Sequence, residues 1–195
     1  MTRVLLATRN SGKVAELQRI LAPYGMSLEG ASYEPGPETG ASFADNALAK
    51  AREGVAETGL PSVADDSGLT VDALNGMPGI LSARWAGRHG DDLANLQLVL
   101  GQLSDVPDSR RGAAFVCAAA YALPDGRSEV VLGELRGTLI REPRGSNGFG
   151  YDPIFVPLGY DVTSAELSPE EKDAISHRGQ AFRALAPLLA AALPA

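Results

Sequence analysis

The chain has 195 residues, of which 45% are hydrophobic and 21% charged, and this predicts one soluble globular domain rather than a disordered segment. Its formal net charge of −7 argues against a nucleic acid polymer as partner, because a polyanion requires a basic surface. The single cysteine, Cys117, excludes an internal disulfide and a cysteine-rich zinc site and favours a cytoplasmic protein. The N-terminal apolar run is too short for a signal peptide, and the Ala- and Leu-rich tract near the C-terminus is shorter than a membrane span. We therefore expect no membrane partner.

The first half of the chain alternates short apolar runs with helical periodicity, which is typical of an α/β sheet. The chain begins with a predicted strand over residues 4–7, a polar loop over 8–12 and a helix with Val14, Leu17 and Leu21 on one face. A strand over 26–29 and a Pro- and Gly-rich loop over 34–40 come next, followed by a helix from Ser42 to about Glu57. The last predicted elements of this half are a strand that ends at Asp65-Asp66 in a Ser-Gly turn, a turn over 76–79 and a helix over 91–103.

The second half has a different pattern, richer in strands. Strands over 113–123 and 129–135 flank a Pro-Asp-Gly turn, and a third strand over 137–141 continues this antiparallel meander. Ser168, followed by Pro169, begins a capped helix, and a closing helix follows Gly179. Together the two halves predict an α/β fold with a mixed sheet, built as an elongated, two-lobed single domain over residues 1–195. The active site is expected in the cleft between the lobes.

Asp65 and Asp66 form the most informative pair in the sequence. Two adjacent carboxylates repel each other, so such a pair is retained most readily where a cation or a reacting group needs it. Neighbouring side chains of a strand point to opposite faces, so we expect one Asp to reach a metal or a water while the other anchors the turn from behind. Mg²⁺ suits such a site, because it prefers oxygen ligands and shares its shell with substrate phosphates. The alternative is a simple acidic turn that caps a loop.

A metal ion bound by Asp66 needs further oxygen ligands, and we expect them just before or at the start of the helix that follows Ser42. Glu38 and Asp45 are the two candidates, and Lys50 lies five residues beyond Asp45. The alternative is a solvated acidic first turn, which is common in helices because negative charge is favourable at their N-terminus.

The segment from Thr8 to Lys13 joins a strand to a helix N-terminus, where free N–H groups and the helix dipole favour an anion. It lacks the glycine spacing of a Walker A loop, so we interpret it as a phosphate loop of another type; the alternative is an ordinary capped helix. The chain has fourteen Arg but only three Lys, namely Lys13, Lys50 and Lys172, which suggests that these positions need a compact ammonium.

Phe149 lies between two glycines, which leave its ring accessible to a flat ligand such as a nucleobase. The alternative is a glycine-rich hairpin with Phe149 in the core. His177 and Arg178 add hydrogen-bond donors near a helix boundary. Such donors suit the six-position oxygen of hypoxanthine or xanthine and would remain unpaired against the amino group of adenine.

Taken together, these segments resemble the inosine triphosphate pyrophosphatase family, whose members remove non-standard purine nucleotides such as ITP, dITP and XTP. The similar segments cover nearly the whole chain: residues 5–13, Asn46-Ala47, residues 50–52, residues 65–69, residues 71–74, Pro78-Gly79, residues 82–84, residues 148–155, residues 165–167 and residues 176–179.

This resemblance implies a homodimeric hydrolase that depends on Mg²⁺ and cleaves between the α- and β-phosphates to give the nucleoside monophosphate and pyrophosphate. Asp66 corresponds to the catalytic carboxylate that prepares the attacking water, and Glu38 and Asp66 correspond to the metal ligands. The resemblance also implies two sets of substrate-binding positions. The phosphates are held by Thr8, Arg9, Asn10, Ser11, Gly12, Lys13 and Ser67, and Lys172 assists them. The base is held by Phe149, Gly150, Tyr151, Asp152, His177 and Arg178. Asp45 departs from the family pattern, where Glu is common, and its carboxylate is one methylene group shorter.

Two alternatives of other kinds remain open at this level. One is a related nucleotide pyrophosphatase that prefers pyrimidine or modified nucleotides, against which the purine-type segments around Phe149 and His177 argue. The other is a nucleotide sensor without catalysis, against which the retained carboxylates Glu38, Asp65 and Asp66 argue. Cys117, in an apolar run, is interpreted as a packing residue rather than a nucleophile.

Overall fold

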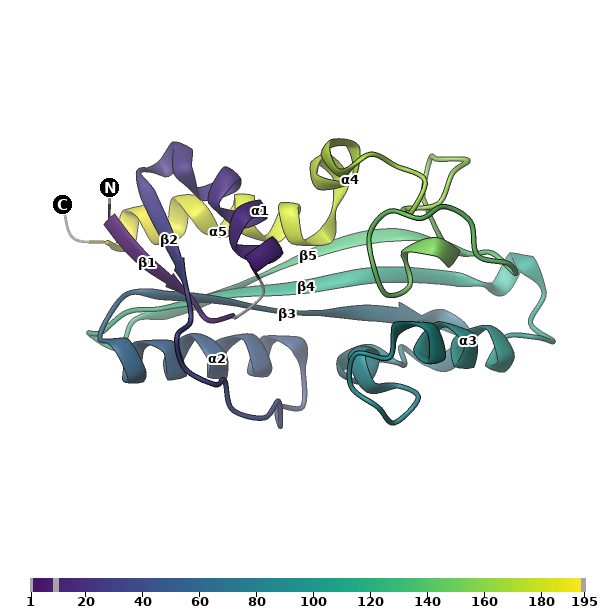
Figure 1. Cartoon of the computed structure of the whole chain (residues 1–195), viewed down its shortest axis with the longest axis horizontal. Coiled ribbons are helices and arrows are strands. Elements are labelled where there is room, and N and C mark those ends of the chain that lie inside the picture. Colours follow the sequence, from purple (N-terminus) through teal and green to yellow (C-terminus); the bar gives the residue numbers. More distant parts are fainter. Residues whose placement is uncertain (1, 9–10, 194–195) are drawn as a thin grey trace. The chain divides into compact units, whose positions relative to one another are not determined.

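The computed structural model describes residues 2–8 and 11–193, and for residues 11–13, 15 and 16 it describes the backbone alone. Its strands and helices are β1 (Thr2–Leu6), α1 (Ser11–Leu21), β2 (Met26–Gly30), α2 (Phe43–Thr58), β3 (Ser62–Val71), α3 (Asp92–Gln102), β4 (Gly112–Ala122), β5 (Ser128–Leu139), β6 (Phe155–Pro157), α4 (Pro169–Ile175) and α5 (His177–Ala192) (Figure 1).

The sheet is mixed, as predicted. Within the described residues its six strands follow the order β2-β1-β3-β4-β5-β6. Strand β1 is parallel to both β2 and β3, whereas β5 and β6 are antiparallel. The predicted α/β class is therefore confirmed.

The chain divides into two compact units, each discontinuous in sequence. The unit that we call N-terminal comprises Met1–Asp66, Cys117–Gly133 and His177–Ala195, and the unit that we call central comprises Ser67–Val116 and Glu134–Ser176. The assignment of residues 1–195 to one functional domain remains a prediction.

In the N-terminal unit, the two faces of the strands are packed in different ways. Helices α1 and α5 cover one face, and α2 covers the other (Figure 1). The face under α1 and α5 buries large side chains, among them Leu6, Leu17, Phe182 and Leu185. The buried apolar cluster between the sheet and α2 consists of alanines, with larger side chains only among its partly buried members: Ala7, Ala47, Ala51, Ala64, Ala118, Ala120 and Ala122.

The alanine face brings α2 close to the sheet. A Cβ atom at Gly54, in the C-terminal half of α2, would collide with Ser62 and with Leu5 on the neighbouring strands. Such a close approach allows short polar side chains of α2 to touch a strand residue directly. This packing is what positions the candidate site.

The central unit has its own core, built from Leu69, Val71, Leu96, Val99, Leu103, Ala113, Phe115, Leu139, Tyr151, Ile154 and Phe155. The guanidinium of Arg111 is buried beside this core and donates to the carbonyl oxygens of Leu103, Leu139 and Ile140 at 2.8, 2.8 and 3.1 Å. These bonds tie the end of α3 to the end of β5.

Among residues 2–8 and 11–193, no helix combines the length and hydropathy that crossing a bilayer requires.

Two predicted breaks in strands are wrong. Strand β3 does not turn after Asp66 but continues through Ser67 and Gly68 to Val71. The buried side chains of Leu69 and Val71 continue its alternation, which keeps the backbone extended. Likewise, the strands predicted over 129–135 and 137–141 are one strand, β5.

Close packing, rather than a break, explains the glycines of β5. A Cβ atom at Gly137 would collide with the backbone of Val156 and the ring of Phe155, and a Cβ atom at Gly133 would collide with the backbone of His177. A glycine inside a strand often marks such a close approach.

The closing helix starts earlier than predicted. Helix α5 begins at His177, and Gly179 lies in its first turn. The chain changes direction at Ser176, whose backbone is extended with φ −60° and ψ 146°. The boundary between α4 and α5 therefore lies at Ser176 and not at the glycine.

Candidate active site

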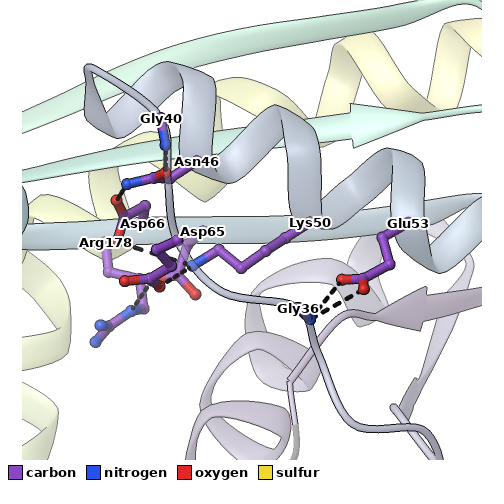
Figure 2. A network of polar contacts seen from close by, with 9 residues as sticks. Gly36, Gly40, Asn46, Lys50, Glu53, Asp65, Asp66 and Arg178 are labelled. Carbon is purple, nitrogen blue, oxygen red and sulfur yellow. Dashed lines mark hydrogen bonds and ion pairs between the residues drawn. The ribbon is translucent and has the colours of Figure 1, made fainter. Parts of the chain in front are cut away.

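Asp65 and Asp66 leave strand β3 on opposite faces, as predicted, and both are buried. The carboxylate of Asp66 faces α2, whereas that of Asp65 accepts a hydrogen bond from Nε of Arg178 on α5 at 3.2 Å (Figure 2). The prediction that one of the pair anchors a turn is wrong, because Asp65 instead holds the first turn of a helix.

Asp66 is surrounded by side chains of α2 and of the loop that precedes it. Nδ2 of Asn46 donates to Oδ2 of Asp66 at 2.8 Å. Nζ of Lys50 lies 3.8 Å from Oδ1 of Asp66 and donates to Oε1 of Glu38 at 2.8 Å. The structure therefore brings the two predicted metal ligands, Glu38 and Asp66, to the same ammonium group.

The electrostatics of this cluster favour a reactive carboxylate. Burial raises the pKa of Asp66 above its ordinary value, although the charge of Lys50 and the hydrogen bond from Asn46 oppose this effect. Burial by itself lowers the pKa of Lys50, but the charges of Asp66 and Asp65 and the contact with Glu38 outweigh it, so this pKa is raised. Lys50 therefore remains a cation, and Asp66 is a better proton acceptor than an exposed carboxylate.

One face of α2 supplies most of these contacts. Asn46, Lys50 and Glu53 are spaced by four and three residues, which places them on the same side of the helix (Figure 2). Asn46 and Glu53 also hold the loop that carries Glu38: Oδ1 of Asn46 accepts from the N–H of Gly40 at 2.7 Å, and Glu53 accepts from the N–H of Gly36 at 2.9 Å. From the sequence we expected Lys50 to be needed as a compact ammonium, but we assigned no role to Asn46 or Glu53, although the helical spacing of the three residues was visible there.

A cavity of about 240 Å³ lies between this loop and α2. Its walls are formed by Gly36, Pro37, Glu38, Thr39, Asn46, Ala49, Lys50 and Glu53. Within the N-terminal unit, Glu38, Asn46 and Lys50 thus face a cavity that a small ligand can enter.

Asp45, the other candidate ligand, takes part in the helix cap instead. Oγ of Ser42 accepts from the N–H of Asp45 at 3.1 Å and donates to its carboxylate at 2.8 Å. The side chain is exposed, so the alternative of a solvated acidic first turn describes Asp45 well.

The predicted phosphate loop lies between β1 and α1, as expected from the sequence. Thr8 is described, and its carbonyl oxygen accepts from the N–H of Ala31 at 2.9 Å. Arg9 and Asn10 lie outside the described residues, as do the side chains of Ser11 and Lys13 and the surroundings of Gly12. Ser67, half-buried in β3, directly follows Asp66 and leaves the strand on the other face.

The predicted base-binding loop lies in the central unit. The ring of Phe149 is 61% exposed, which excludes the alternative of a core residue. The buried carboxylate of Asp152 accepts from the N–H of Phe149 at 2.9 Å and pairs with Lys172. Nζ of Lys172 lies 5.1 Å from the centre of the Phe149 ring, so the structure places this lysine, which we expected to assist the phosphates, against the aromatic ring.

Glycines and a tyrosine hold this loop in place. Gly148 has a φ of +74°, and a Cβ atom there would collide with the carboxylate of Asp152, so the position requires glycine. The N–H of Gly150 donates to Asp92 at 3.0 Å. Tyr151 is buried and donates to the carbonyl oxygen of Ser82 at 2.8 Å, and burial raises its pKa.

His177 and Arg178 are the first residues of α5, and both are buried in the N-terminal unit. Arg178 pairs with Asp65, as described above. Their predicted contact with a base remains a prediction.

Comparison with known proteins identifies the family. Residues 4–188 match the model of the Ham1 family. A dITP/XTP pyrophosphatase of Mycobacteroides abscessus is 61% identical over 96% of this chain and 94% of its own length, and one of Streptomyces avermitilis is 60% identical over 97% and 98%. A solved HAM1 protein of Coxiella burnetii is 44% identical, with a TM-score of 0.90 over 97% of this chain and 98% of its own. The resemblance seen in the sequence is confirmed, and the chain belongs to the Ham1 family.

Proposed function

We propose that this chain is a nucleoside triphosphate pyrophosphatase that hydrolyses dITP, ITP and XTP to the nucleoside monophosphate and pyrophosphate. The observation that carries the proposal is the cluster of buried Asp66 with partly exposed Glu38 and Lys50, in a chain about 60% identical over nearly its full length to proteins named dITP/XTP pyrophosphatase. An acidic group of raised pKa beside a fixed ammonium suits hydrolysis of a phosphoanhydride.

Each residue of the cluster has a distinct part in this proposal. Asp66 accepts hydrogen bonds from the attacking water and takes its proton. Lys50 neutralises charge that develops on the phosphate oxygens during cleavage. Residues 8–13 and Ser67 hold the phosphates, which a strand–loop–helix segment supports because helix N-termini bind anions.

The carboxylates fit a divalent cation. Glu38 and Asp66 already converge on one cation, the ammonium of Lys50, and oxygen ligands are those that Mg²⁺ prefers. Among the described residues no group of three or more His, Cys, Asp and Glu side chains is placed to hold a metal, so substrate phosphates and water would complete the shell. We propose Mg²⁺ with Glu38 and Asp66 as its protein ligands. When bound, such an ion neutralises phosphate charge and orients the water and the leaving group.

The base is assigned to the Phe149 loop and to His177 and Arg178. The exposed ring of Phe149 offers a stacking surface, and its backbone and that of Gly150 are fixed by the carboxylates of Asp152 and Asp92. Donors such as those of His177 and Arg178 suit an oxygen at the six-position of the purine, which distinguishes hypoxanthine and xanthine from adenine.

Product analysis tests this function. Purified protein with Mg²⁺ is incubated with dITP, ITP, XTP, ATP, GTP and dTTP, and monophosphate and pyrophosphate are quantified. We expect both products from the first three nucleotides and little from the others. Release of orthophosphate or preference for dTTP would contradict the proposal, and bound dITP without turnover would indicate a sensor.

We further propose that the protein is a homodimer located in the cytoplasm. Both parts of this proposal are supported by the family resemblance, and the second also by the single, buried cysteine. Light scattering coupled to gel filtration tests the first, and cell fractionation the second.

A further inference from the structure

We propose that Asn46 is the positioning residue of this site, because one amide group orients Asp66 and fixes the loop that carries Glu38. The effect on turnover rests on the proposed function, whereas the contacts themselves do not. Asn46 is 1% exposed, so water does not replace its partners.

Both ends of the amide are used, and they are not interchangeable. Nδ2 donates to Oδ2 of Asp66 at 2.8 Å, and Oδ1 accepts from the N–H of Gly40 at 2.7 Å. Rotating the amide by half a turn would point its oxygen at a carboxylate and its NH₂ group at an N–H. Each contact therefore locks the other.

Gly40 is matched to this contact in shape. A Cβ atom there would lie 2.6 Å from Oδ1 of Asn46 and 2.7 Å from Cβ of Asp45. Its backbone has no left-handed φ, so the requirement for glycine comes from space and not from conformation. Any side chain at position 40 would push the loop, and with it Glu38, away from α2.

The hydrogen bond from Asn46 also decides which oxygen of Asp66 faces Lys50. With Oδ2 turned to Asn46, Oδ1 faces the ammonium of Lys50 at 3.8 Å, and the same ammonium contacts Glu38. Asn46 is therefore coupled to both carboxylates that the proposed chemistry uses. Partners of this kind, which orient reacting groups from behind, commonly affect activity 10- to 100-fold.

The central unit offers a matched control in Asn95. It is also a helical asparagine, 1% exposed, and its Oδ1 accepts from the N–H of Ala86 in a neighbouring loop at 2.7 Å. Its Nδ2, in contrast to that of Asn46, has no hydrogen-bond partner among the described residues. Asn→Asp at either position keeps the oxygen that holds the loop and removes the NH₂ group.

The first test compares kcat and KM of Asn46→Asp and Asn95→Asp with dITP at saturating Mg²⁺. We expect Asn46→Asp to lower kcat about 10- to 100-fold with KM changed less than about threefold. Asn95→Asp is expected to keep kcat within about threefold of the parent. Equal losses in both variants, or a change confined to KM, would overturn the proposal.

The second test measures the hydrogen bond without using activity. Asn46→Asp is expected to lower the melting temperature by on the order of 5 °C, because it sets two carboxylates against each other. The double variant Asn46→Asp/Asp66→Asn reverses the donor and the acceptor, so it should recover most of this loss while remaining inactive. If the melting temperature of the double variant falls by the sum of the decreases in the two single variants, Asn46 and Asp66 are not coupled and the proposal is refuted. If the parent protein does not hydrolyse dITP, the proposed function fails, and this thermal cycle alone decides about Asn46.

Discussion

Each unit of the molecule contains a buried or half-buried lysine paired with a carboxylate, and the two pairs have different surroundings. In the N-terminal unit Lys50 is shared between Glu38 and Asp66, and nearby Asp65 is paired with Arg178. Two carboxylates, Glu38 and Asp66, thus converge on one ammonium group, an arrangement that suits the binding of a cation. In the central unit Lys172 and Asp152 neutralise each other beside the exposed ring of Phe149, which suits an uncharged flat group.

The comparison indicates that the two units have different functions, one in the reaction and the other in recognition of the base. The convergence of two carboxylates on one ammonium and the raised pKa of Asp66 are features of a reacting site. A neutral ion pair under an aromatic surface is a feature of a recognition site, because it orients a ring without adding net charge. The three predictions below test whether chemistry and recognition separate in this way.

Asp66→Asn should have the largest effect. It keeps the shape of the side chain and removes its capacity to take a proton, so we expect kcat for dITP to fall by about 10³-fold or more. Binding of dITP, measured by calorimetry, should persist. The control is Asp72→Asn, which changes an exposed carboxylate paired with Arg136. Turnover within tenfold of the parent would remove Asp66 from the role of proton acceptor.

Lys50→Met should destabilise the metal-free protein. It leaves Glu38 and Asp66 without their shared cation, and we expect a loss on the order of 2 kcal/mol in the free energy of unfolding, since the group is partly screened by solvent. Added Mg²⁺ should restore more stability to this variant than to the parent, which denaturant titration with and without the ion measures.

Arg136→Met is the matched control for Lys50→Met, because Arg136 also contacts two carboxylates, Asp72 and Glu134, but at the surface. Its loss should be below about 1 kcal/mol and independent of Mg²⁺. An equal response of both variants to the ion would argue against a cation site at Glu38 and Asp66.

Phe149→Ala should have the smallest effect on the fold and a selective effect on binding. Loss of a stacked base weakens nucleotide binding by about 1–3 kcal/mol, while the exposed ring contributes little to stability. Calorimetry with dITP measures the first and thermal unfolding the second. Leu158→Ala, at a 78% exposed position of the same unit, is the control and should leave affinity unchanged. A similar loss in both variants would deny Phe149 its role as a stacking surface.

Glycine accounts for the errors of the sequence analysis. Gly68 was interpreted as part of a turn, Gly137 as the first residue of a separate strand and Gly179 as a helix boundary, and each lies inside a regular element. A glycine indicates a position where a Cβ atom would not fit. The sequence does not tell whether the reason is the backbone conformation of the glycine or a neighbouring segment packed against it. At Gly137 the cause is strand β6, which is recognised only once the sheet has formed.

The sequence by itself determined those features that depend on residues close together along the chain. They include the cap of α2 at Ser42, the capped start of α4 at Ser168, the opposite faces of Asp65 and Asp66, and the ordered motifs that identify the Ham1 family. These follow from short-range geometry, so they are visible without knowledge of the fold.

Only the tertiary structure decided which side chains meet. Asn46 contacts Asp66 from 20 residues away, and Arg178 contacts Asp65 from 113 residues away. The first contact depends on the alanine face that lets α2 approach the sheet, and the second on the packing of α5 against the opposite face. Such pairings arise from the burial of apolar surface over whole elements, which no local pattern of residues specifies.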